Sequence, residues 1–228
     1  MIVIKNASLR RIISRVVPYI AIPLIVAVGI FVFEEKRWAM VALGVAVCTV
    51  LLFLAGFDSG KTGSRRLILS AVLSALSVAG RFIPIFKPVT AITMIAGMWL
   101  GGEAGFLVGS MSALVSNIYF GHGPWTPFQM FAWGMIGLFS GYLSVPLRKS
   151  RIFLLIAGAL AGGLYSMIMD IWTIMWYNGS MDLSLYAAAM VTALPHTIIY
   201  VLSNVIFLFI LAGPIGEKLS RVKIKYGV

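Results

Sequence analysis

Long apolar stretches alternate along the chain with short clusters of charged residues. Read from one cluster to the next, the apolar stretches cover residues 16–33, 38–57, 67–80, 88–102, 104–147, 152–177 and 185–211. A helix that crosses a membrane needs about 20 apolar residues in succession, and most of these stretches have that length. The third is short, but we expect its helix to continue past Arg81 toward Phe86. The pattern therefore predicts a bundle of transmembrane helices.

The stretch 104–147 is too long for one helix. Residues 121–127 lie inside it with the sequence Gly-His-Gly-Pro-Trp-Thr-Pro, and paired glycines and prolines end helices from both sides. A further turn is expected around Asn178-Gly179, before the last stretch. Division of 104–147 into two helices gives eight predicted spans.

The composition excludes an ordinary soluble domain. The chain has 228 residues, of which 61% are hydrophobic and only 11% are charged. One soluble domain of this length cannot bury so much apolar surface while it exposes so few charges. Cys48 is the single cysteine, so an internal disulfide and a metal site built from several cysteines are both excluded.

The basic residues predict how the chain is oriented. Lysine and arginine number 18 against 7 acidic residues, for a net charge of +11. With the N-terminus in the cytoplasm, the eight-span scheme places fourteen of the 18 inside and only Lys36, Arg37, Arg81 and Lys87 outside. This asymmetry follows the positive-inside rule and predicts that both termini lie in the cytoplasm. We therefore attribute the positive charge to orientation of the chain in the lipid bilayer and not to binding of nucleic acid.

Small residues recur every four positions in several of the predicted spans. Such spacing lets helix backbones approach closely, and most of these residues are expected to serve packing within the chain. The series Ala71, Ala75 and Ala79 is also a candidate docking face for another membrane protein.

Polar and aromatic residues collect near the predicted outer ends of the spans. Polar side chains in lipid are costly unless they are paired or hydrated, so their gathering on one side predicts a ligand cavity that opens outward. The aromatic members also fit an ordinary interfacial belt. The candidate substrate-binding residues are Arg81, Lys87, Asn117, Tyr119, His122, Trp125, Gln129, Trp133, Asp170, Trp172, Trp176 and His196.

Two of these candidates have a structural alternative. Asp170 interrupts an otherwise apolar span and is a functional candidate by default, but an ion pair with Arg81 or Lys87, or a hydrogen bond to a neighbouring helix, would also explain it. His196 follows Pro195 in the middle of the last span, where a packing role is favoured over contact with a ligand.

Catalysis finds little support in the sequence. His196 and Ser203 lie seven residues apart on one span, without a glycine-flanked nucleophile motif, and the chain has no His-Glu-x-x-His metal motif. Residues 55–62 fit a relaxed phosphate-loop pattern, but no soluble α/β domain surrounds them. An intramembrane enzyme that uses His196 and Ser203 stays one alternative, and a structural scaffold without a ligand is another.

Several segments together resemble a known transporter family. They are Pro-Val-Thr-Ala at 88–91, Ala-Gly-Phe-Leu-Val-Gly at 104–109, Ser-Ala-Leu-Val-Ser-Asn at 112–117, Gly-His-Gly-Pro-Trp-Thr-Pro-Phe-Gln-Met at 121–130 and Trp-Gly at 133–134. They are similar to the substrate-binding (S) components of energy-coupling factor (ECF) vitamin transporters, most closely to the cobalamin-specific group. The resemblance covers about residues 66–222.

The resemblance implies an all-α integral membrane protein with a six-helix core at 63–228. Residues 1–62 would then be an N-terminal extension of two transmembrane helices. The family's Ala-x-x-x-Ala docking pattern matches Ala71 and Ala75.

The same resemblance implies a function without chemistry. The chain would capture a vitamin from outside the cell, with cobalamin or a related corrinoid as the first expectation and another vitamin or precursor as the alternative. It would dock onto a transmembrane scaffold (T) subunit whose two ATPase subunits hydrolyse ATP, so neither a metal nor a catalytic cofactor is expected.

Overall fold

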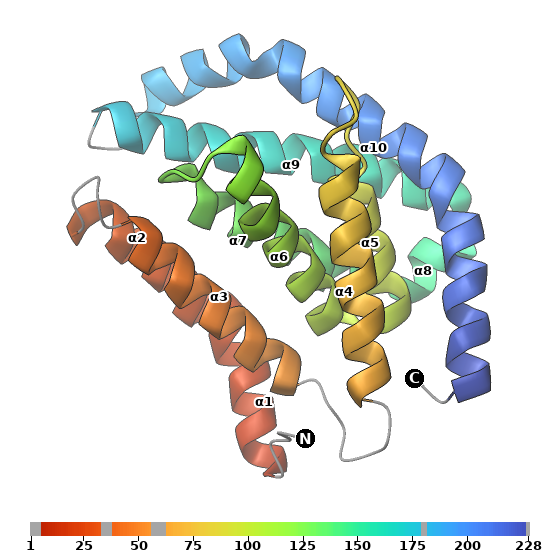
Figure 1. Ribbon diagram of the computed structural model, residues 1–228. Coiled ribbons are helices and arrows are strands. Elements are labelled where there is room, and N and C mark those ends of the chain that lie inside the picture. Colours follow the sequence, from red (N-terminus) through yellow and green to blue (C-terminus); the bar gives the residue numbers. More distant parts are fainter. Residues whose placement is uncertain (1–5, 33–37, 56–62, 179–181, 227–228) are drawn as a thin grey trace.

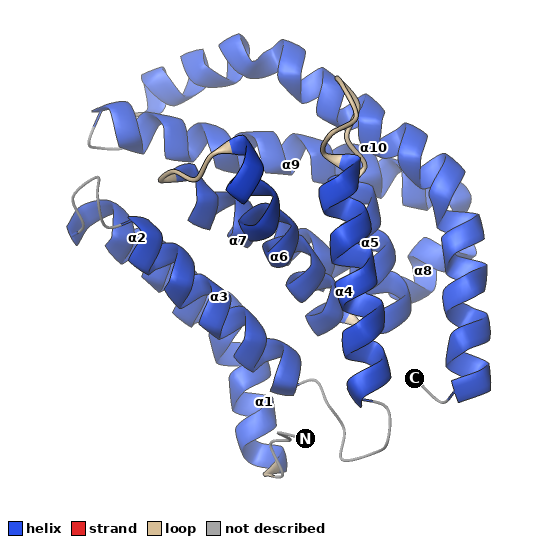
Figure 2. Ribbon diagram, in the orientation of Figure 1, coloured by secondary structure: helices blue, strands red, loops and turns tan. Residues whose placement is uncertain are grey.

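The computed structural model describes residues 6–32, 38–55, 63–178 and 182–226 (Figure 1). These residues form helices joined by short connections, and none of them forms a strand (Figure 2). The all-helical prediction is therefore confirmed for the described part of the chain. Lys36, Arg37, Gly179 and nearly all of the phosphate-loop-like segment 55–62 lie outside it.

Three of the described helices are long and apolar enough to cross a membrane, by length and composition. They are Ala7–Gly29, Arg151–Asn178 and Leu183–Lys225, whereas Met40–Ala55 and Val89–Leu100 are apolar but shorter. The membrane class predicted from the sequence fits these helices. The count of eight spans and the side of the membrane that each end faces stay predictions.

The N-terminal part forms a helical hairpin beside the rest of the bundle. The first arm is continuous through α1 (Ala7–Val16), a short π-helix (Val17–Ala21) and α2 (Ile22–Val32), and the second arm is α3 (Trp38–Ala55). The first arm begins well before the predicted span 16–33, because Asn6 caps α1. Oδ1 of Asn6 accepts hydrogen bonds from the backbone N–H groups of Ser8 and Leu9 at 2.9 and 3.2 Å. The second arm packs against α6 and α7.

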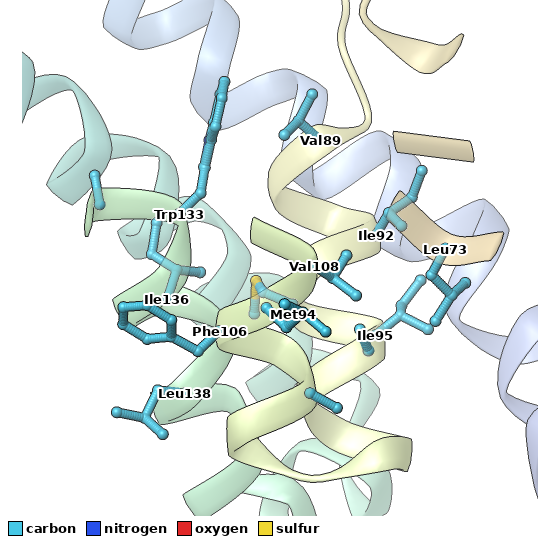
Figure 3. Close-up of a cluster of buried hydrophobic side chains, with 14 of the residues drawn as sticks. Leu73, Val89, Ile92, Met94, Ile95, Phe106, Val108, Trp133, Ile136 and Leu138 are labelled. Carbon is cyan, nitrogen blue, oxygen red and sulfur yellow. The ribbon is translucent and has the colours of Figure 1, made fainter. Parts of the chain in front are cut away.

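Helix α5 is the centre of the core. The surrounding helices are α4 (Gly63–Gly80), α6 (Gly102–Phe120), α7 (Trp125–Tyr142), α8 (Ser144–Lys149), α9 (Arg151–Asn178) and α10 (Leu183–Tyr226), and all six contact α5 (Val89–Leu100). Of the 12 residues of α5, only Trp99 is not buried. Its length of about 18 Å is short of the hydrocarbon core of a bilayer. Buried side chains of α4 to α7 gather around it (Figure 3), which makes α5 a core helix enclosed by its neighbours.

The expectation that the third span stays helical toward Phe86 is wrong. Helix α4 ends at Gly80, and residues 81–88 form a non-helical connection. Pro84 cannot continue a helix, and the next residue, Ile85, has a φ of +63°, which is unfavourable for a β-branched side chain. Pro88 packs so closely that a Cβ on Gly80 would lie 2.3 Å from its Cγ. The two prolines therefore determine where the helix stops.

The predicted break inside the stretch 104–147 is confirmed. Helix α6 ends at Phe120 and α7 begins at Trp125. Gly121 has a φ of +93°, which a side chain would disfavour, and Pro124 serves as the N-terminal cap residue of α7. A further helix, α8, begins near the end of the same stretch and runs from Ser144 to Lys149, which the sequence pattern did not predict.

Three glycines bring α5, α6 and α7 into backbone contact. A Cβ on Gly137 of α7 would lie 2.3 Å from the carbonyl group of Gly105 of α6, and a Cβ on Gly97 of α5 would lie 2.1 Å from the carbonyl oxygen of Gly137. No other residue fits at such distances, so the packing interpretation of these small residues is confirmed. The close approach holds the three helices that carry most of the candidate site.

Helix α10 is longer than the predicted span 185–211. It runs from Leu183 to Tyr226 with Pro195 and Pro214 inside it, and it arches over α9 before it turns down past α5 (Figure 1). Asp182 caps its N-terminus, since Oδ1 accepts from the backbone N–H of Leu185 at 3.1 Å and from both the hydroxyl and the backbone N–H of Ser184. These hydrogen bonds, first the one from the Ser184 side chain, lower the pKa of Asp182. The start of α1 and the end of α10 lie at the same lower end of the bundle in Figure 1.

Candidate functional site

The connection 81–88 lies at the upper end of the bundle in Figure 1, and a buried network of polar side chains includes its first residue, Arg81. Nη1 of Arg81 donates to Oδ1 of Asn117 at 2.7 Å and to the hydroxyl of Ser116. Nδ2 of Asn117 donates to Oγ1 of Thr126 and to Oε1 of Gln129, each at 2.9 Å. We call these five residues the polar cluster. Asn117 is its centre, because both sides of its amide are hydrogen-bonded while its side chain is only 1% exposed.

Aromatic rings enclose the cation of the polar cluster. The guanidinium carbon of Arg81 lies 4.8 Å from the ring centroid of Phe120 and 5.4 Å from that of Trp133. Trp133 stacks on Tyr165 with centroids 4.8 Å apart, and Tyr165 meets Tyr200 edge to face at 5.0 Å. We call these four rings the aromatic wall: Phe120, Trp133, Tyr165 and Tyr200. They come from α6, α7, α9 and α10, so four helices contribute to it.

A second cation joins Arg81 at a small cavity. The cavity has a volume of about 20 Å³ and is lined by Arg81, Lys87, Val89, Thr90, Trp133 and Tyr200. The indole N–H of Trp133 donates to Oγ1 of Thr90 at 3.2 Å, and Nζ of Lys87 lies 5.3 Å from the ring of Phe120. Burial lowers the pKa of Lys87, and the nearby charge of Arg81 lowers it further. None of the residues that line the cavity is acidic.

The remaining tryptophan candidates form a group of their own. Trp125 of α7 meets Trp172 of α9 edge to face at 5.8 Å, and Trp172 stacks on Trp176 at 6.5 Å. Trp176 is 37% exposed. The structure thus gathers these three residues, but through contacts different from those of the polar cluster.

Asp170 is buried on α9 without the predicted partner. It is 8% exposed, and no ion pair within 4.0 Å joins it to Arg81 or Lys87 among the described residues. The ion-pair alternative for this residue is therefore wrong.

The other three candidates are not members of the polar cluster. Tyr119 is 72% exposed and packs its ring on Phe82 at 4.6 Å. His122 lies in the connection between α6 and α7, partly buried. His196 lies on an exposed face of α10.

The enzyme alternative required His196 to act on Ser203. Ser203 is 1% exposed, and its hydroxyl donates to the backbone carbonyl of Lys87 at 2.8 Å. Seven residues of helix separate the two side chains by about 10 Å along the axis, and His196 is exposed where Ser203 is buried. The described geometry therefore does not assemble a nucleophile and base from this pair. Among the described residues there is also no group of three His, Cys, Asp or Glu side chains that could hold a metal ion.

Seven residues of the site were not among the predicted candidates, among them Val89 of the cavity and Phe120 beside Arg81. Ser116 and Thr126 had a signal in the sequence. Ser116 directly precedes Asn117, and Thr126 lies one helical turn before Gln129, so each is at the same end of the bundle as a predicted candidate. Thr90, Tyr165 and Tyr200 had none, since each reads as one more residue of an apolar span. Only the packing of α5, α9 and α10 places them against Trp133.

The predicted docking alanines line a separate apolar groove. Ala71, Ala75 and Ala79 are all exposed on α4. With Val50 of α3 and Met111 of α6 among the other lining residues, they border a groove of about 910 Å³. We call it the alanine groove. Its alanines are thus not consumed by packing among the described helices.

The family model described as "ECF transporter, substrate-specific component" matches residues 65–215. The chain belongs to this family. The match spans α4 to α9 and most of α10, including every residue of the polar cluster, and leaves the N-terminal hairpin outside. No curated protein and no solved structure gives a match.

Membership confirms the resemblance at the level of the family. This S component is a membrane protein and a substrate-binding subunit of a transporter, and the family is not one of enzymes. S components in general work with a T scaffold subunit and ATPase subunits. The resemblance to the cobalamin-specific group is a finer prediction that family membership does not test.

Proposed function

We propose that this S component captures a vitamin from outside the cell and delivers it to an ECF module for ATP-driven uptake. One observation carries the proposal: the hydrogen-bonded polar cluster lies against an aromatic wall at the end of the bundle where 81–88 connects α4 to α5. Fixed polar groups beside aromatic surface are typical of sites that orient a small organic ligand. The basic residues predict that this end faces outward, with both termini in the cytoplasm of the plasma membrane.

Cobalamin or a related corrinoid is the first ligand to test. The support for it is the segment 121–130, which resembles the cobalamin-specific group. The same segment supplies Thr126 and Gln129 to the polar cluster. Ligand pockets usually have volumes of about 300–1,000 Å³, far above the cavity of about 20 Å³ beside Arg81. A whole vitamin therefore binds here only if the segments that line this cavity move apart. Another vitamin or precursor is the alternative.

Delivery requires a partner, and we propose that the alanine groove provides the docking surface for the T subunit. Ala71, Ala75 and Ala79 keep this face of α4 flat, so a partner helix can approach its backbone closely. Two ATPase subunits would drive transport.

Calorimetry with the purified protein in detergent tests the proposal. The titrants are a panel of water-soluble vitamins that includes cyanocobalamin, and we expect one of them to bind with micromolar or tighter affinity. Gln129→Ala removes one partner of Asn117 and should weaken that ligand at least tenfold. Thr192→Ala, on an exposed face of α10, serves as the matched control and should leave affinity unchanged.

The outcomes separate the parts of the proposal. Binding of a vitamin other than a corrinoid would remove cobalamin as the substrate and keep the function. Binding of no vitamin at all would contradict the function itself.

A further inference from the structure

The cavity beside the polar cluster carries two positive charges that the described residues do not neutralise. Arg81 and Lys87 both line it, and their charges repel each other. Partly buried cations are costly unless an anion or hydrogen-bond acceptors compensate them. The compensation that Arg81 receives from the polar cluster is two neutral oxygens, those of Ser116 and Asn117.

The described acidic residues are engaged elsewhere. Glu103 pairs with Arg66 near the start of α4, and Glu217 pairs with Arg221 near the end of α10. Asp182 caps α10. Asp170 does not line the cavity and forms no ion pair with either cation. Within the described part of the chain, no carboxylate lies within 4.0 Å of Arg81 or Lys87.

The hydrogen bonds of Arg81 hold its side chain in one position without using all of its donors. Both bonds to the polar cluster leave from Nη1, and a guanidinium carries five N–H groups in a planar fork. Such a fork matches the two oxygens of a carboxylate or phosphate. Thr90 accepts from Trp133, which leaves its own hydroxyl hydrogen available as a donor at the same cavity.

The size of the cavity fits part of a ligand. A space of about 10–15 Å³ is enough for one water molecule, and this cavity has about 20 Å³. It therefore has room for a group of a few atoms at most, while the rest of a solute must lie beyond it. An oxygen of an acidic group meets both conditions, since it is small and compensates the two cations.

We propose that the solute carried by this S component has an acidic group, a carboxylate or a phosphate, and that Arg81 and Lys87 bind it. The inference rests on the proposed function and names the chemical class of its substrate. Arg81 binds the group through its free donors, Lys87 supplies the second charge from the connection 81–88, and the aromatic wall contacts the remainder of the solute.

Pairs of compounds that differ in the acidic group alone test this inference in calorimetry with the purified protein. Nicotinate with nicotinamide and pantothenate with pantothenol test a carboxylate. Riboflavin phosphate with riboflavin and pyridoxal phosphate with pyridoxal test a phosphate. We expect the acidic member of one pair to bind at least tenfold more tightly than its neutral partner, and the pair that responds distinguishes the two groups.

Lys87→Gln is the decisive variant, because the side chain of Lys87 is not part of the polar cluster. It should weaken binding of the acidic member more than binding of the neutral member, so that the preference for the acidic member falls about tenfold. Lys218→Gln removes an exposed lysine from α10 and should leave the preference unchanged. Arg81→Gln should reduce the preference further, although the loss of its hydrogen bonds also affects folding.

Mass spectrometry of the ligand released by heat from protein purified out of rich medium covers solutes outside these pairs. A bound ligand without an acidic group would overturn the inference, and so would a neutral member that binds as tightly as its acidic partner. In both cases the proposed function would stand. If no compound binds and no ligand is released, the proposed function fails, and this inference fails with it.

Discussion

Nη1 of Arg81 lies 2.7 Å from Oδ1 of Asn117, so a charged hydrogen bond ties the residue after α4 to the last turn of α6. The other side of the same amide reaches Thr126 and Gln129 of α7. Asn117 therefore joins three segments that no backbone hydrogen bond connects.

Replacement of Asn117 by alanine should weaken both folding and binding. The change removes from the interior one hydrogen bond each of Arg81, Thr126 and Gln129, at a cost of about 1–3 kcal/mol. In a chain of this size, each kcal/mol lowers the unfolding midpoint by about 2–4 °C. Thermal unfolding in detergent should show this loss, and calorimetry should show at least tenfold weaker binding of the best vitamin ligand.

Thr192→Ala is the matched loss of a polar group outside the site. Thr192 is exposed and bonds only the Ala188 carbonyl of its own helix, at 2.8 Å. Its replacement should change stability by no more than about 0.5 kcal/mol. If Asn117→Ala unfolds at the same temperature as Thr192→Ala and binds as tightly as the unaltered protein, the polar cluster has no part in either property.

The glycine contact between α6 and α7 predicts a large difference between two identical substitutions. Gly137→Ala places a Cβ 2.3 Å from backbone atoms of Gly105, which cannot rotate away as a side chain would. The helices must separate, at a cost of at least about 1–3 kcal/mol. Gly163→Ala on α9 meets nothing within 4 Å and should stabilise its helix by about 0.5–1 kcal/mol. Unfolding midpoints that move in the same direction for both variants would contradict this account of the packing.

Two ion pairs of unequal burial predict unequal effects of removing one charge. Nη2 of Arg66 lies 3.2 Å from Oε2 of Glu103, with 13% and 26% of the two side chains exposed. Glu103→Gln should lower stability by about 1 kcal/mol, because the charge of Arg66 stays partly buried. Nη2 of Arg221 lies 3.7 Å from Oε2 of Glu217, and the two side chains are 80% and 72% exposed. Glu217→Gln should therefore lower stability by less than about 0.5 kcal/mol. Equal shifts of the unfolding midpoint would show that burial does not matter for the Arg66 pair.

Much of the helical architecture could be predicted because apolar stretches and helix breakers act locally. The break between Phe120 and Trp125 follows from the glycines and proline that separate them. The end of α4 was misplaced because the apolar pattern continues through Ile83 and Phe86, while the effect of Pro84 on the chain outweighs it. The true end of α10 was missed for the opposite reason: its last residues are charged, and their helix does not depend on an apolar sequence.

The site was predictable only as far as polarity revealed it. Arg81, Asn117 and Gln129 are unusual in apolar surroundings, so composition alone marks them as candidates, and they do come together. Trp133 was predicted as well, but its partner Tyr165 was not, because a tyrosine in an apolar span has no distinguishing neighbour in the sequence. His196 is exposed and Ser203 is buried, although both lie on α10. Which positions of this long helix are buried depends on how it bends over α9, and the sequence pattern does not show that bend.

Docking through the alanine groove predicts a variant that binds its vitamin but does not transport it. Ala75 is exposed on α4 and lines the groove, so Ala75→Trp fills the space that a partner helix would need. Leu76→Trp is the control, because Leu76 is 45% exposed on the same helix but does not line the groove. In cells that contain the ECF module, uptake of the best vitamin ligand should be lost in Ala75→Trp and kept in Leu76→Trp, while both purified proteins bind it normally. Uptake that survives in Ala75→Trp, or is lost equally in both variants, would place the docking surface elsewhere.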